Sequence, residues 1–163
     1  MKKILLFLLF LAANGFSQER FELTPDGFAS VVITRPDKTD EKLIESSKFW
    51  AATYNKDEHD VYEITENSLS IDALRNNAFF YRNLGEIFKY RIRYTLKVSF
   101  EEKTCTIGFI VKDIYTERTL TKTTIADFYT ADGRIKEDYQ EVKPSLEITA
   151  NKILRSYVNA LSN

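Results

Sequence analysis

The segment Lys89–Phe100, KYRIRYTLKVSF, alternates apolar and polar residues without a break. Its apolar positions are Tyr90, Ile92, Tyr94, Leu96, Val98 and Phe100, and its polar positions are Lys89, Arg91, Arg93, Thr95, Lys97 and Ser99. A period of two over this length is typical of an antiparallel strand with one buried face and one solvated face. The next residues, Glu101-Glu102-Lys103, predict a turn. A return strand over Thr104–Ile114 follows, with Cys105, Ile107, Phe109 and Val111 on one side.

Shorter strands are expected on the N-terminal side of this hairpin. FASVVIT, residues 28–34, follows the turn signal Pro25-Asp26-Gly27 and ends before Pro36, which biases the residue before it away from helical angles. Three further short strands are predicted at 61–66, 69–74 and 78–82.

Two helices flank the strands. Asp37, Thr39 or Asp40 can cap the first, which runs to about Tyr54. Its apolar stripe comprises Leu43, Ser47, Trp50, Ala51 and Tyr54, with Ile44 beside it. The second covers about 145–162 and has Pro144 in its first turn. Residues 115–142, Thr-rich and then polar, are predicted to form a ribbon or a long loop.

The first 17 residues are typical of a signal peptide. Lys2 and Lys3 precede ten apolar residues, 4–13, and small residues lie at Gly15 and Ser17. The run is shorter than the ~20 residues that span a bilayer, so cleavage after Ser17 is favoured over an uncleaved anchor or a buried helix. No Cys follows the run, so a lipoprotein is not expected. The predicted product, residues 18–163, is a single periplasmic or secreted domain with no second spanning segment.

Composition excludes several classes of protein. The chain has 163 residues, one Cys, one His and a net charge of −1, which becomes −3 after removal of residues 1–17. One Cys cannot form an intramolecular disulfide framework or a Cys-rich zinc site. A nearly neutral chain gives no overall case for binding nucleic acid or an anionic membrane.

The helix KLIESSKFWAATYN, residues 42–55, together with the strand pair KYRIRYTLKVSF and TCTIGFIVKDIY, resembles an uncharacterised family of exported bacterial domains with a TATA-binding-protein-like (TBP-like) fold. The resemblance covers about 28–115, and the C-terminal helix completes it. It implies a twisted, mainly antiparallel sheet in the order strand, helix, four strands, helix, with both helices on one face. It implies no activity, cofactor or catalytic residue.

The polar face of the 89–99 strand is the first candidate site. Lys89, Arg91, Arg93 and Lys97 would lie along one sheet face at intervals of ~6.6–7 Å or multiples of them. The face could bind an anion or a protein partner. Against a polyanion stand the acidic net charge and the lack of stacking aromatics on this strand face. The alternative is a solvated face paired with acids such as Glu63 or Glu101.

An aromatic surface is the second candidate. Phe79, Phe80 and Tyr81 are consecutive, so neighbours point to opposite faces of a strand and one of them could remain uncovered. An exposed aromatic patch would mark a surface that binds a protein or ligand. The alternative, which the frequent burial of aromatic residues favours, is a core position under the 116–142 segment.

Residues with catalytic potential do not form a known pattern. Asp57-Glu58-His59-Asp60 is the only cluster of acids and histidine, and adjacent residues point in different directions, which disfavours a metal site. Residues 127–138 lack the ligand pattern of a calcium loop. Cys105 could be activated only by a neighbouring base, and His59 is the only histidine. The position of Cys105 in a strand favours a buried, inert thiol over an exposed one that pairs with another molecule. No nucleophile elbow, zincin, P-loop or dinucleotide motif occurs, so no cofactor is expected.

The sequence therefore predicts an α+β domain. Its expected role is a non-enzymatic binding or accessory module of the periplasm or cell envelope that acts through its open sheet face. The expected partner is an envelope protein or ligand rather than nucleic acid, and self-association is allowed. The alternative is a hydrolase that uses paired carboxylates on an envelope glycan or peptide.

Overall fold

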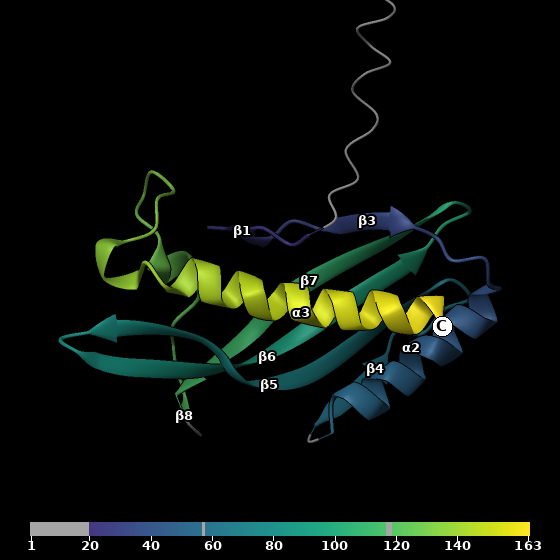
Figure 1. Ribbon diagram of the computed structural model, residues 1–163, viewed down its shortest axis with the longest axis horizontal. Coiled ribbons are helices and arrows are strands. Elements are labelled where there is room, and N and C mark those ends of the chain that lie inside the picture. The colour runs from purple at the N-terminus through teal and green to yellow at the C-terminus, as the bar shows by residue number, and fades with distance from the viewer. Residues whose placement is uncertain (1–19, 57, 117–118) are drawn as a thin grey trace, which may run out of the picture.

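The computed structural model describes residues 20–56, 58–116 and 119–163 (Figure 1). The predicted signal peptide lies outside the described residues. The main sheet is antiparallel, with strand order β3-β7-β6-β5-β4 and β8 also paired with β7. Its strands are β3 (Val31–Thr34), β4 (His59–Tyr62), β5 (Ser68–Asn83), β6 (Glu86–Phe100), β7 (Thr104–Thr116) and β8 (Thr119–Leu120). A small separate hairpin joins β1 (Leu23–Thr24) to β2 (Gly27–Phe28).

Helices α2 (Asp40–Tyr54) and α3 (Val142–Ser162) pack on one face of this sheet, as expected from the sequence (Figure 1). Thr39 is the N-cap of α2, and its Oγ1 accepts a hydrogen bond from the backbone N–H of Lys42. The C-terminal helix starts at Val142, about three residues earlier than the predicted boundary. Among the described residues, no helix has the length and apolar character needed to cross a membrane.

The core lies between the two helices and the sheet. Trp50 of α2 packs edge-on against Tyr157 of α3, with ring centroids 5.0 Å apart, and its Nε1 donates to Ser156 Oγ at 3.0 Å. The Tyr157 hydroxyl lies 2.7 Å from Ser47 Oγ, which itself donates to the carbonyl of Leu43. Burial of these two hydroxyls therefore leaves neither without a partner.

The hairpin predicted from Lys89–Ile114 is confirmed. β6 and β7 pair from Tyr90↔Thr116 to Phe100↔Cys105. The register shifts where Arg93 faces Asp113 and Tyr94 faces Val111, so Lys112 is the extra residue of a β-bulge. The bulge returns Ile114 to the buried side, where only 2% of it is exposed, although the alternation before it would place it on the other face.

The predictions for the shorter strands need correction. Residues 69–74 and 78–82 belong to one strand, β5, which continues through a register shift between Arg75 and Phe79. The strand predicted at 61–66 instead covers His59–Tyr62 and ends before Glu63, whose φ of 50° is incompatible with an extended strand. The strand predicted at 28–34 is interrupted after Phe28 and resumes at Val31.

Helix α3 seals the outer edge of β5 beyond β4. Three residues one helical turn apart bind alternate β5 residues. Thr149 Oγ1 donates to the carbonyl of Ala78 at 2.6 Å, and Ser145 Oγ accepts from the N–H of Phe80 at 3.3 Å. Glu141, the N-cap residue of α3, accepts from the N–H of Arg82 at 3.3 Å. Four helical residues rise ~6.0 Å and two strand residues ~6.7 Å, so the two repeats nearly match. Polar side chains of a helix thus replace a neighbouring strand.

Residues 115–142 were predicted to form a ribbon or a long loop, and the described part of this segment contains several short elements. It holds the end of β7, then β8, two short 3-10 helices at Ile125–Phe128 and Glu137–Tyr139, and a bridge between Tyr129 and Ile135. Phe128 and Tyr129 are buried. This segment packs over the aromatic end of the β5–β6 hairpin, because Phe128 contacts Phe79 and Tyr139 contacts Tyr81.

Candidate functional site

The sheet face opposite the helices, which we call the open face, carries the basic residues predicted from the sequence. Register places Arg91, Arg93, Thr95 and Lys97 of β6 on it, with the even-numbered β5 residues 70–74 and the even-numbered β7 residues 106–110 beside them. The two helices cover only the other face (Figure 1).

Acidic neighbours balance part of the basic row. Arg93 donates to Glu58 at 2.6 Å and lies 3.8 Å from Asp113. Lys97 lies 3.8 Å from Glu63, one of the two acids expected to pair with this row. The other, Glu101, instead accepts from the Thr104 hydroxyl. A polyanion that approached Arg93 or Lys97 would meet these carboxylates as well.

A second polar group on the open face centres on Asp72 of β5. Its carboxylate accepts from Thr95 Oγ1 at 2.5 Å and from the Tyr62 hydroxyl at 3.0 Å, and it lies 3.6 Å from Lys112 Nζ. The negative charge of Asp72, together with Tyr62, raises the pKa of Lys112 above its usual value. The β-bulge matters here, because it is the bulged residue that carries the ammonium group.

Tyrosines from neighbouring strands also lie on this face, although β6 itself contributes none. The Tyr115 ring lies 5.5 Å from the Arg91 guanidinium, and the Tyr62 ring lies 6.0 Å from the Lys112 ammonium. Both distances are in the range of cation–π contacts. Alternation within one strand does not reveal these residues, because they belong to β7 and β4 and only strand pairing brings them beside the basic row.

Lys89 and Arg91 also line a shallow hollow of about 750 Å³ near the β5 register shift. Asn76, Asn77 and Thr119 complete its polar lining. Asn77 has a φ of 49°, a left-handed conformation that Asn tolerates better than most residues. The predicted basic row is thus divided between this hollow and the ion-paired part of the open face.

The three consecutive aromatic residues fall on two faces, as alternation predicts. Phe79 is 1% exposed and stacks on Tyr90 at 4.9 Å. Tyr81 is partly buried and stacks on Phe88 at 5.1 Å. Phe80 lies on the opposite face, with the Arg82 guanidinium 5.2 Å from its ring. Most of this aromatic content is therefore core beneath the 116–142 segment.

Cys105 and His59, the residues with the most reactive side chains, contact the core and the backbone of the fold. Cys105 is fully buried, and this burial raises the pKa of its thiol to about 11. The His59 ring lies 3.0 Å from the carbonyl of Asn55 through Nδ1. In the part of the chain that the structure describes, no three His, Cys, Asp or Glu side chains gather in a way that could hold a metal ion.

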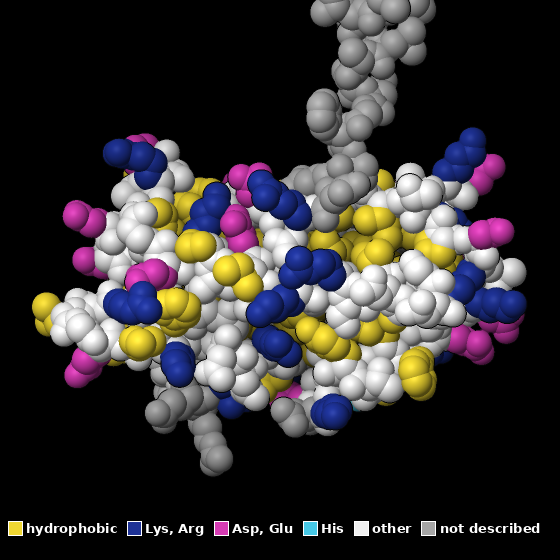
Figure 2. Space-filling view, viewed as in Figure 1, with side chains coloured by type: hydrophobic (Ala, Val, Ile, Leu, Met, Phe, Trp, Pro, Cys, Tyr) yellow, Lys and Arg dark blue, Asp and Glu magenta, His cyan; other side chains and the backbone are white. Residues whose placement is uncertain are grey.

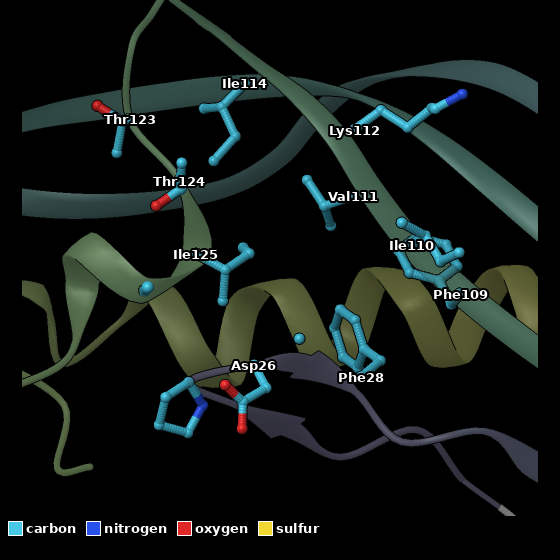
Figure 3. Close-up of a pocket in the computed structure, with 13 residues that line it drawn as sticks. Asp26, Phe28, Phe109, Ile110, Val111, Lys112, Ile114, Thr123, Thr124 and Ile125 are labelled. Carbon is cyan, nitrogen blue, oxygen red and sulfur yellow. The ribbon is translucent and has the colours of Figure 1, made fainter. Parts of the chain in front are cut away.

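A hollow beside β7, which we call the β7 groove, has no counterpart in the sequence-based predictions. Its volume is about 410 Å³, and it lies between β7, the β1–β2 hairpin and residues 123–126 (Figure 3). Val111 and Ile125 point into it, whereas Lys112 points away (Figure 3). Phe28 and Phe109 form an apolar wall, with ring centroids 5.2 Å apart. Polar residues, among them Asp26 and Thr124, lie at its rim.

Comparison with known proteins identifies the fold. No family model matches the chain, and no curated protein matches it. Among solved structures, a DUF4468 family protein from Bacteroides ovatus is similar with a TM-score of 0.61 and 11% identity, over 90% of this chain and 92% of that one. A TBP-like protein from Parabacteroides distasonis is similar with a TM-score of 0.54 and 11% identity, over 83% and 92%.

At 11% identity these likenesses establish architecture and leave activity undetermined, since one fold serves many functions. They agree with the resemblance found in the sequence, both in the TBP-like arrangement and in pointing to a family of uncharacterised domains. The chain therefore has a TBP-like α+β fold, with two helices on one face of an antiparallel sheet and the other face open.

Proposed function

We infer that this protein is an exported, non-enzymatic binding module of the cell envelope and that its open face binds a folded protein partner. The observation that carries the proposal is the combination of Tyr62, Tyr115, Arg91 and Arg93 on one uncovered sheet face. Tyrosine and arginine are the residue types most often found at the energetic centres of protein interfaces.

The open face is also ordered before any partner arrives. Asp72 is held by Thr95 and Tyr62, and Arg93 is held by Glu58, so these side chains lose less conformational freedom on binding than free ones would. Ile110, which is 45% exposed, adds apolar area among them. A preorganised face of this kind lowers the entropic cost of association.

The arrangement of charge selects the class of partner. Two cations on β6, Arg93 and Lys97, lie within 4 Å of acids from neighbouring segments, so this part of the face carries charges of both signs. A polyanion gains from a uniformly basic surface, whereas a protein surface can match charges of both signs. The proposal of a protein partner rests on this mixture of charges, and export rests on the sequence of residues 1–17.

The test compares wild-type protein with Arg93→Glu and with Arg155→Glu, a matched substitution on the exposed side of α3. Immobilised proteins are incubated with envelope extract, and captured partners are quantified, purified and measured in binding titrations. Thermal unfolding shows whether each variant is folded. We expect one partner to be bound by wild type and Arg155→Glu and to be lost by Arg93→Glu.

Equal capture by all three proteins, or no specific capture, would contradict the proposal. Turnover of an envelope glycan or peptide by the purified wild type would favour the hydrolase alternative. Retention on heparin that falls on charge reversal at Arg91 and Arg93 would instead support a polyanion ligand, and unchanged retention would exclude one.

A further inference from the structure

We propose that the β7 groove binds an extended peptide segment of a partner protein, which pairs as an added strand with the edge of β7 between β3 and β8. This site lies at the edge of β7, where it shares Ile110 and Lys112 with the open face but none of Tyr62, Arg91, Arg93 and Tyr115. The proposal does not depend on the function inferred above.

The edge of β7 has strand partners at its two ends. β3 pairs with it at Thr104–Ile107, and β8 pairs with it at Tyr115 and Thr116. Beyond these, Thr121 donates to the carbonyl of Ile114 through both its N–H and its hydroxyl. Within residues 20–56, 58–116 and 119–163, no strand pairs with residues 108–113 on this side. About six residues of strand edge, ~20 Å long, therefore lie between the two partners.

The lining of the groove shows that it lies at this edge. Phe109 and Val111 belong to the helix-facing side of β7, whereas Ile110 and Lys112 belong to the open side, and all four line the same hollow. Residues from both faces of a strand can border one hollow only along the strand's edge. A chain placed there would reach the outward-facing peptide groups of β7 and the apolar wall together.

Contacts with α3 hold the β1–β2 hairpin across the groove from β7, so this hairpin does not pair with residues 108–113. Asn151 of α3 accepts from the N–H of Phe21 at 2.8 Å and donates to its carbonyl at 2.9 Å. Glu147 accepts from the N–H of Leu23 at 2.9 Å. Gly27, with a φ of 107°, then turns the chain back into β2. The β1–β2 hairpin is thus attached to the helix and lies opposite β7 across the groove (Figure 3).

The outer edges of β5 and β7 differ in what covers their peptide groups. Side chains of α3 occupy the outer peptide groups of β5 at Ala78, Phe80 and Arg82. Unpaired strand edges are usually covered, shortened or charged, because they pair readily with other chains. The six-residue interval of β7 has instead an apolar hollow of about 410 Å³ beside it, a volume within the range of ligand sites.

The geometry indicates a single extended chain as the occupant. β3 and β8 close both ends of the interval, so the long edge of a folded sheet, including that of a second copy, would collide with them. Side chains of an added strand alternate, so every second residue would face Phe28, Phe109 and Ile125. The expected ligand is therefore a segment of five or six residues with apolar side chains at alternate positions. The carboxylate of Asp26 at the rim favours a segment that also carries a basic residue.

The test begins with a phage-displayed library of random linear peptides selected on the purified protein. The best sequence is synthesised and titrated against wild type, Thr123→Trp and Thr53→Trp. Thr123 lines the groove, and an indole there would fill it, whereas Thr53 is exposed on α2. We expect selected sequences with alternating apolar residues, affinity at least about tenfold lower for Thr123→Trp, and unchanged affinity for Thr53→Trp.

A second measurement tests strand pairing directly and needs no variant protein. Each residue of the selected peptide is N-methylated in turn, which removes one backbone donor. Pairing with β7 predicts that binding falls at every second position, because alternate N–H groups of an added strand face β7. Selection of no binder, binding insensitive to Thr123→Trp in a folded protein, or loss without a two-residue period would overturn the proposal.

Discussion

Replacement of Thr149 by Val tests whether α3 stabilises the fold by acting as a partner for the edge of β5. The side chain is 9% exposed, and its Oγ1 donates to the carbonyl of Ala78 at 2.6 Å. Valine has nearly the same shape and helix propensity, so the substitution removes the hydroxyl and little else. The carbonyl of Ala78 then loses its donor where water has little access.

The expected loss follows from two opposing contributions. A buried acceptor left without a partner costs about 1–3 kcal/mol. The methyl group that replaces the hydroxyl returns up to about 0.8 kcal/mol by its burial. The free energy of unfolding should therefore fall by about 1–2 kcal/mol. For a domain of about 145 residues, that corresponds to a decrease in Tm of about 3–7 °C.

Urea unfolding followed by circular dichroism measures the change, and an unaltered m value shows that the compactness of both states is preserved. Thr53→Val is the matched control. Its Oγ1 also donates to a backbone carbonyl, that of Phe49 at 2.9 Å. This site is exposed, so water can replace the hydroxyl as the donor. If Thr149→Val and Thr53→Val change stability equally, the hydrogen bond to Ala78 does not hold the β5 edge.

Four further outcomes are expected. Leu84→Asn should raise the free energy of unfolding by about 0.5–1 kcal/mol in the same urea assay. Leu84 is 98% exposed and has a φ of 49° in a two-residue hairpin loop, a position that favours Asn. A lower stability of the variant would contradict this explanation. Gly108→Ala should be neutral or stabilising by up to about 1 kcal/mol in the urea assay, because the atoms nearest to an added Cβ would be Ser30 Oγ at 3.4 Å and Lys97 Cβ at 3.8 Å. Cys105 should react with a thiol reagent at pH 8 only as fast as the protein unfolds. Burial raises its pKa from 9.0 to about 11, so the unfolded thiol ionises first and stability should decline as pH rises through this interval; rapid labelling of folded protein would refute it. Mass spectrometry of the exported protein should show Gln18 as its first residue, whereas an intact N-terminus would exclude cleavage.

Regular alternation made the central hairpin predictable. Twelve residues of period two in β6 leave one register that buries the apolar face, because a one-residue slip would expose all of it. The same reasoning failed for β5. The register shift between Arg75 and Phe79 breaks the period, so one long strand was predicted as two. Contacts with α3, some 65 residues away, keep that strand extended, and local sequence does not encode them.

The candidate sites, like the strands, were only partly predictable from the sequence. The basic residues of the open face were predictable, because they follow one another at even spacing in a single strand. Tyr62, Asp72 and Tyr115 were not, because they come from three other strands and meet the basic row only through the observed register. The β7 groove was not predictable either, since it is formed by the space between segments rather than by a pattern within one.

Periodicities within short segments were enough to predict the α+β class, the two helices and the buried face of β6. Which charges are paired, and which strand edge is covered or accessible, depends on the tertiary structure. Side-chain contacts between distant segments set those features: α3 satisfies the peptide groups of β5 and holds the β1–β2 hairpin, and the edge of β7 between β3 and β8 borders a groove as a result.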